Sequence, residues 1–301
     1  MTPRDRRVLD ADRLLPLAGA ALLALPVFAG VAYALLASFG VLGPGASTSD
    51  AGARLARWSA VLSTRSTWVS LGWSVYVAAT STALATCGAI AIASAFTRHT
   101  VTDRVARTLA TLPLPVPHLV AAASALLVLG QSGLLARIGA AFGWIASPAD
   151  MPALVYDRAG VGLVLTLAWK ELPFLALVAV SLRRTIGAHY EEAAAALGAG
   201  TMARWRLITW PLLWRGLLPS VIAVFVFALG SYETAVLLAP VSPAPLPVLT
   251  MERFADPALA RRGEAYVLAL LALGLALVAV LVHEWTRARW ARLAPAARGA
   301  T

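Results

Sequence analysis

Charged side chains within long apolar runs are the residues of this sequence most able to do chemistry. Lys170 and Glu171 occur in Ala-Trp-Lys-Glu-Leu-Pro-Phe, and Tyr232 and Glu233 occur in Gly-Ser-Tyr-Glu-Thr. Charges in such runs are costly to bury and usually functional. One hypothesis is that these four residues line a path for a solute, with Glu171 or Glu233 facing a cation. The alternative is that Lys170 forms an ion pair with Glu171 or Glu233 that orients helices, because an unpaired buried charge is costly.

Other reactive side chains do not form a recognisable catalytic, cofactor or metal site. The histidines are scattered without the spacing of metal ligands: His99, His118, His189 and His283. We interpret His118, beside Pro117, as a satisfied interfacial side chain. The single cysteine, Cys87, excludes a disulfide framework and a thiolate metal site. The single lysine, Lys170, does not follow a glycine-rich turn, so the chain has no P-loop, and we expect it not to be an enzyme.

The composition indicates that these residues are carried by membrane-spanning helices. Of 301 residues 59% are apolar and 13% charged, with a mean hydropathy of +0.76, whereas soluble domains are about half apolar and a quarter charged. Runs of about twenty apolar residues can cross a hydrocarbon core of ~30 Å. Six spans are predicted, at roughly residues 14–39, 68–96, 109–130, 160–182, 216–238 and 265–283. The net charge of +10 does not indicate nucleic-acid binding, because the arginines lie in short segments between these runs.

Two spans need separate comment. The first follows several arginines, as a signal peptide does, but it is far longer than the ~7–15 apolar residues of a signal peptide, so we expect a retained helix. The third is interrupted by Pro113, Pro115 and Pro117. Because proline lacks an N–H and clashes with the preceding turn, the true helix is predicted to begin near Pro117.

The arginines also predict the orientation of the chain. With a cytoplasmic N-terminus, cytoplasmic segments hold about twice as many arginines as outside segments, and this bias sets topology. We therefore predict an all-α polytopic protein with both termini in the cytoplasm. Cytoplasmic tails at residues 1–13 and 284–301 flank a transmembrane domain at residues 14–283. The outside segment Ala239 to Asp256, rich in proline, is either a contact loop for a binding protein or a passive linker.

The long cytoplasmic segment at about residues 183–215 is predicted to form two short helices with a turn. Glu191 and Glu192 favour the first turn of a helix, and the alanines that follow are strong helix formers. Gly198 and Gly200 can end that helix, and Thr201 is a plausible N-cap for the next one. Pro211 then opens the fifth span.

Large apolar residues of the same segment could anchor a partner protein. The anchors are Tyr190, Leu197, Trp205 and Ile208, and the small residues between them allow another backbone to approach closely. This pattern is typical of a helix that docks into a groove. The alternative is a capped helix pair whose alanines pack on neighbouring spans.

The segment resembles the loop shared by the inner-membrane permease subunits of binding-protein-dependent ABC importers. That family carries Glu-Ala-Ala, three residues, Gly, nine residues, and Ile-x-Leu-Pro. This chain matches at Glu192, Ala193, Ala194, Gly198, Ile208 and Pro211. It departs at Trp210, where the family usually has leucine, which affects only the packing where the chain enters the membrane.

The resemblance implies a division of labour in a bacterial inner membrane. The loop would dock on a cytoplasmic ABC ATPase dimer, with Glu192 and Gly198 as the key positions. ATP and Mg²⁺ would be bound by that partner, so this chain would carry no cofactor. A second permease subunit would complete the path, and an extracytoplasmic substrate-binding protein would deliver the solute.

The substrate is the least defined part of the resemblance. The segments around Lys170 and Glu233 resemble the spermidine/putrescine branch, which weakly favours a polyamine-like cation. Related permeases for iron, thiamine, sulfate or phosphonate remain alternatives. An ion-coupled secondary transporter is a further alternative, although such proteins usually show inverted repeats and paired broken helices. A membrane-embedded enzyme would need an acid or histidine cluster that the sequence lacks.

Overall fold

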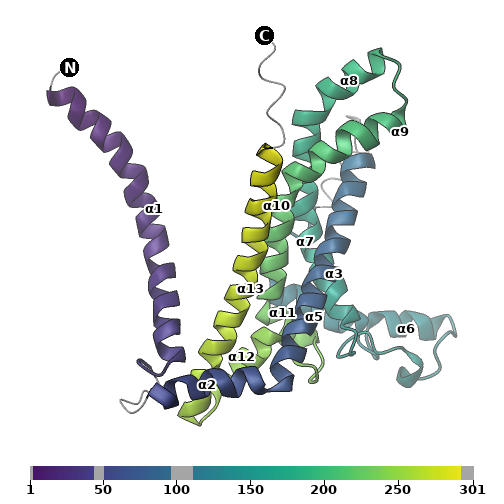
Figure 1. The fold of residues 1–301 in the computed structure, drawn as a ribbon. Helices are drawn as coiled ribbons and strands as arrows, with labels where there is room; N and C mark the ends of the chain where they lie inside the picture. The colour runs from purple at the N-terminus through teal and green to yellow at the C-terminus, as the bar shows by residue number, and fades with distance from the viewer. Residues whose placement is uncertain (1–2, 44–50, 96–110, 293–301) are drawn as a thin grey trace. The chain divides into compact units, whose positions relative to one another are not determined.

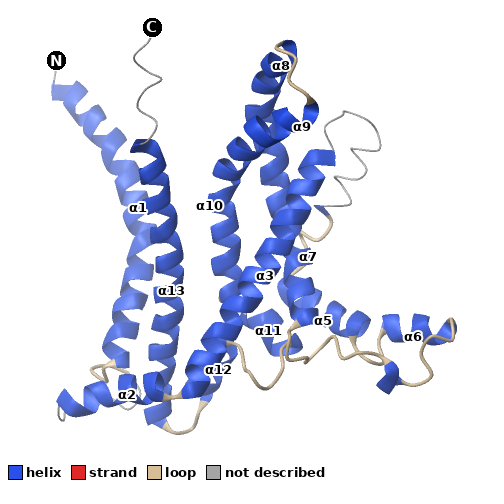
Figure 2. Ribbon diagram, turned by 45° about the vertical axis from the view of Figure 1, so that its right-hand side comes forward, coloured by secondary structure: helices blue, strands red, loops and turns tan. Residues whose placement is uncertain are grey.

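The computed structural model describes residues 3–43, 51–95 and 111–292, and all regular elements within these ranges are helices (Figure 2). In chain order they are α1 (Pro3–Ser38), α2 (Ala51–Ser63), α3 (Arg65–Ala95), α5 (His118–Leu129), α6 (Leu134–Ala141), η1 (Pro148–Asp150), α7 (Val161–Leu182), η2 (Arg183–Gly187), α8 (Ala188–Ala196), α9 (Thr201–Arg204), η3 (Trp205–Thr209), α10 (Trp210–Leu229), α11 (Tyr232–Leu238), α12 (Leu246–Ala255) and α13 (Leu259–Arg292). η1 is a 3-10 turn, whereas η2 and η3 are π-helical.

Six helical stretches of the described chain are long and apolar enough to cross a membrane, as predicted. They are Ala18–Ser38, Arg65–Ala95, His118–Ala141, Val161–Thr185, Thr201–Leu229 and Arg261–Arg289. The prediction for the end of the fifth span was wrong. Gly230 caps α10 with φ −92° and ψ 0°, and the apolar residues beyond it form the separate helix α11. Hydropathy continued through this break, because a turn between two apolar helices leaves the apolar run intact.

The chain forms two compact units, one of residues 1–67 with 249–273 and the other of residues 68–248 with 274–301. In the first, the described contacts gather around α2. The Arg57 guanidinium donates from Nη1 to the carbonyl of Ala37 at 2.9 Å. Trp58 stacks on Phe39 with ring centroids 5.7 Å apart. Gly263 lies close to the same side chain, because a Cβ there would be 2.8 Å from the Arg57 guanidinium carbon, so a larger residue would require Arg57 to shift.

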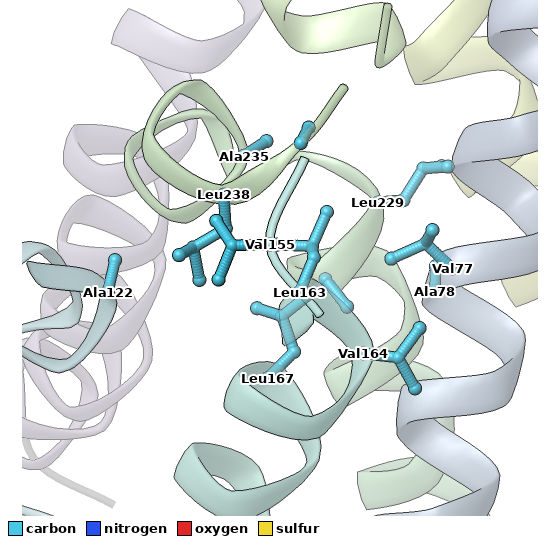
Figure 3. Packing of buried hydrophobic residues seen from close by; sticks show 12 residues of the cluster. Val77, Ala78, Ala122, Val155, Leu163, Val164, Leu167, Leu229, Ala235 and Leu238 are labelled. Carbon is cyan, nitrogen blue, oxygen red and sulfur yellow. The ribbon is translucent and has the colours of Figure 1, made fainter. Parts of the chain in front are cut away.

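The core of the second unit depends on small residues along α3. Ala85, Ala89 and Ala93 recur every fourth residue, are buried, and pack against leucines of α7 and α10. Such a row of small side chains lets membrane helices approach closely. A second cluster joins α3, α5, α7, α10 and α11, and Leu163, Leu238 and Val155 are among its buried members (Figure 3).

The third predicted span is helical from His118 onward, with Pro117 as N-cap, so the prediction for its start is confirmed. Residues 112–117 form turns instead of a helix, with Leu114 N–H donating to Thr111 and Val116 N–H donating to Pro113. The twelve residues of α5 reach only about 18 Å at 1.5 Å per residue.

Candidate functional site

The predicted helix pair is present and extends beyond the ends of α3 and α10 in Figure 1. A glycine ends its first helix. Gly198 has φ +84°, and its N–H donates to the carbonyl of Ala195 while that of Ala199 donates to Ala194. These two hydrogen bonds with a left-handed residue form a Schellman motif. The loop's tight turn is therefore encoded locally.

The predicted N-cap of the second helix was wrong. α9 begins at Thr201 and its N-cap is Gly200, whose carbonyl accepts from the Arg204 N–H at 3.0 Å. The Thr201 hydroxyl instead accepts a hydrogen bond from the Arg204 guanidinium at 3.3 Å. Thr201 lies one residue inside the helix because Gly200 adopts the extended backbone that the cap position needs.

A hydrogen bond between α8 and η3 closes the base of the loop. The buried hydroxyl of Thr209 donates to the Glu191 carboxylate. Next to it, Trp205, Trp210 and Trp214 form a continuous stack, with ring centroids 5.5 and 5.6 Å apart. Sequence analysis assigned Glu191 only a role in the helix dipole, because its partner lies 18 residues away.

The six motif residues divide between the tip and the base of the loop. Glu192, Ala193 and Gly198 are exposed, whereas the motif residues Ala194, Ile208 and Pro211 are half-buried. Within the loop from α8 to η3, the most exposed large apolar side chains are Leu197 at 89%, Met202 at 75% and Leu207 at 73%. We refer to these three residues as the exposed apolar residues of the loop. Met202 and Leu207 were missed; the position of Met202 two residues after Gly200 could have indicated it, whereas no signal in the sequence indicates Leu207.

A separate polar cluster surrounds Lys170 and Glu171 in α7. Lys170 is only 6% exposed, and its Nζ donates to the carbonyl of Leu114 at 3.2 Å. The Glu171 carboxylate lies 3.1 Å from Nε2 of His118. The His118 ring packs against Phe227 of α10, with centroids 4.8 Å apart. Lys170 thus binds within the proline-rich break, and Glu171 binds His118 directly after it.

The predicted ion pairs of Lys170 with Glu171 or Glu233 are not formed. Consecutive residues of a helix do not face each other, so Lys170 and Glu171 reach different partners. Glu233 is exposed in the first turn of α11, beyond the break at Gly230, and the neighbouring Tyr232 is also exposed. The four predicted path residues therefore form a pair in α7, with Lys170 buried and Glu171 half-buried, and a separate exposed pair in α11.

His118 was interpreted as a satisfied interfacial side chain, and its contact with Glu171 identifies the partner. Within residues 3–43, 51–95 and 111–292, no three His, Cys, Asp or Glu side chains lie close enough to hold a metal ion. Glu171 is the eleventh residue of the stretch Val161–Thr185, about 15 Å from its start at 1.5 Å per residue. In a core of ~30 Å, the cluster lies near mid-membrane.

The chain is similar in sequence to permease proteins of transport systems. No family model matches the chain. The molybdenum transport system permease protein ModB of Mycobacterium tuberculosis is 31% identical over 179 residues, 58% of this chain and 63% of ModB. The thiamine transport system permease protein ThiP of Brucella abortus is 29% identical over 241 residues, 79% of this chain and 41% of ThiP. The chain therefore spans less than two thirds of these relatives.

Solved structures match over nearly the whole chain. A bacterial ABC transporter involved in the import of the acidic polysaccharide alginate gives a TM-score of 0.68 at 16% identity, over 94% of this chain and 99% of the other. An alginate ABC transporter in complex with an alginate pentasaccharide-bound periplasmic protein gives a TM-score of 0.65. The spermidine/putrescine branch is not among these matches. The chain is a multi-pass membrane protein with the fold of an ABC transporter permease.

Proposed function

We propose that this chain is the permease subunit of an ATP-driven ABC importer and forms half of its translocation path. The observation that carries the proposal is the loop from α8 to η3, where the family motif and the exposed apolar residues of the loop occur in one segment. A surface with three large apolar side chains this exposed calls for a partner protein.

In this proposal the loop docks into a cleft of a cytoplasmic ABC ATPase. Leu197, Met202 and Leu207 bury their side chains in the cleft, Glu192 contacts its rim, and Gly198 keeps the turn. Closure of the ATPase dimer around ATP and Mg²⁺ moves the loop, and the bond between Glu191 and Thr209 passes that movement into α10. The loop and both termini then lie in the cytoplasm of a bacterial cell.

Two further partners are a second permease subunit, which we infer from the loop, and a substrate-binding protein, which we infer from a similar protein. One loop per chain requires a second permease, and a homologous subunit is the pairing we favour. The periplasmic protein in the alginate complex supports delivery by a substrate-binding protein.

For the substrate we propose a small solute. The names of the relatives mention molybdenum and thiamine, and none mentions a polyamine. The weak preference for a polyamine rested on Glu171 and Glu233, but Glu171 is engaged with His118. Uptake of labelled molybdate, thiamine and spermidine by cells with and without the chain would distinguish these solutes.

The test of the function is co-purification of a tagged chain from native membranes, followed by identification of its partners. We expect an ABC ATPase, and we expect the double variant Leu197→Ser with Met202→Ser to lose it. Phe142→Ser is the matched control, because Phe142 is also a large exposed apolar residue but lies in the segment after α6. Recovery of the chain alone, with uptake that follows an ion gradient instead of ATP, would favour a secondary transporter.

A further inference from the structure

Residues 112–117 place open backbone near the middle of the membrane. The depth follows from α7, where Lys170 and Glu171 are the tenth and eleventh residues of a 25-residue span. Lys170 contacts Leu114, and Glu171 contacts His118. The segment includes Pro113, Pro115 and the N-cap Pro117, which have no N–H. Three of its carbonyls have partners, because Pro113 accepts from the Val116 N–H, Leu114 from Lys170 Nζ and Pro117 from the Ala121 N–H. Among the described residues, the carbonyls of Leu112, Pro115 and Val116 have no helical partner.

Open backbone at this depth cannot face lipid. Each unsatisfied polar group in hydrocarbon costs several kcal/mol, so irregular backbone within a membrane either lies inside protein or lines a water-filled cavity. Leu112 is 59% exposed, and Leu114, Pro115 and Pro117 are also exposed. Pro113 is buried and Val116 is half-buried, so the described residues of the chain enclose the segment only in part.

Two neighbouring side chains of α7 hold the segment in place. Lys170 donates to the carbonyl of Leu114, and Glu171 holds His118 at the start of α5. A buried ammonium group is costly unless it is hydrogen-bonded. Because Lys170 donates its hydrogen bond to the main-chain carbonyl of Leu114, it ties the unwound segment to the continuous helix α7. The exposed surface of the segment is therefore part of a fixed wall.

We propose that residues 112–117 form part of the wall of the water-filled translocation path at mid-membrane, with main-chain carbonyl oxygens as hydrogen-bond acceptors for the solute or its hydration water. Lys170 is the positioning residue of this wall. This proposal rests on the proposed function only because the chain must be a transporter. It adds to that function a named segment of the translocation path, residues 112–117, which is separate from Glu233.

Cysteine accessibility in the intact transporter, in native membranes, tests the proposal. Cys87 is the single cysteine, so Cys87→Ser gives a background without thiols for Leu112→Cys and Leu114→Cys. The matched control is Leu277→Cys in α13, 52% exposed and near the middle of the span Arg261–Arg289. The reagent is the membrane-impermeant sulfonatoethyl methanethiosulfonate.

We expect Leu112→Cys and Leu114→Cys to react at least about tenfold faster than Leu277→Cys, because the thiolate that attacks the reagent forms only in contact with water. Slow modification at all three positions, with and without ATP, would overturn the proposal and place the segment against lipid or sealed in a protein interface. This result does not depend on recovery of an ATPase, so it can fail independently of the importer assignment.

Lys170 variants test the positioning role. Lys170→Arg keeps a donor for the Leu114 carbonyl, so the modification rate at Leu112→Cys should stay within about twofold, whereas Lys170→Met should change it by at least about fivefold. Expression and thermal stability of the Met and Arg variants, compared with those of the parent chain, test for a general loss of folding. Equal rates in the Met and Arg variants would remove Lys170 from the proposal.

Discussion

His118 and Glu171 lie 3.1 Å apart, from Nε2 to Oε1, although 53 residues separate them in the chain. His118 is the first residue of α5, and Glu171 lies in the middle of α7. Their contact joins a helix that begins within the membrane to one that crosses it. The neighbouring bond from Lys170 to the carbonyl of Leu114 joins α7 to the turns that precede α5.

Removal of the Glu171 side chain should destabilise the protein. Glu171→Ala leaves the half-buried His118 without its partner, and we expect a loss of about 1–3 kcal/mol. Glu171→Gln keeps an acceptor oxygen and should cost less. Glu233→Ala, at an exposed position, should stay within about 0.5 kcal/mol. Thermal unfolding in detergent measures all three, and equal melting temperatures for the two alanine variants would contradict the role of the pair.

Gly198 and Gly200 should respond differently to the same substitution. Neither glycine has an atom within 4 Å of the place a Cβ would take, but only Gly198 has a positive φ, at +84°. Gly198→Ala should therefore cost about 1 kcal/mol through backbone strain alone, and Gly200→Ala should be nearly neutral.

The readout for the glycine pair is ATPase activity of the assembled transporter together with thermal stability. We expect Gly198→Ala to weaken coupling, because the turn that presents Leu197 changes shape. If Gly200→Ala lowered ATPase activity and stability more than Gly198→Ala, the Schellman turn at Gly198 would not be the feature of the loop on which coupling depends.

The hydrogen bond from Thr209 to Glu191 should affect the stability of the protein, whereas Glu192 should affect docking of the ATPase. Thr209→Val removes a buried hydroxyl that donates to the Glu191 carboxylate, and we expect a loss of about 1.5–3 kcal/mol. Thr185→Val, at an exposed position, is the control. Glu192→Ala should leave stability unchanged but reduce recovery of the ATPase. A double-mutant cycle of Thr209→Val with Glu191→Gln that shows no coupling energy would refute the bond.

The alanine row of α3 should not accept larger side chains. Ala89 is fully buried against α7 and α10, so Ala89→Leu should cost about 1–3 kcal/mol by overpacking. Ala83 is exposed on the same helix, and Ala83→Leu should be tolerated. Expression and thermal stability of the two variants provide the measurement, and similar values would mean that α3 and α7 are not closely packed.

Features that depend on neighbouring residues could be predicted from the sequence. The six spans follow from the length of apolar runs, the start of α5 from three prolines, and the loop's turn from Gly198. The motif from Glu192 to Pro211 also lies within one segment, so the proposed docking surface could be located without a structure. The end of α10 could not, because the apolar run continues past Gly230 into α11.

The polar partners were decided by tertiary structure alone. The sequence determined that Lys170 and Glu171 are charges within a membrane span, and that such charges need partners. Whether these partners are Glu233, Leu114 or His118 could not be predicted from the sequence, because the answer depends on which side of α7 faces the break in the third span. Packing of α3, α7 and α10 sets this rotation, and with it the partners of Lys170 and Glu171.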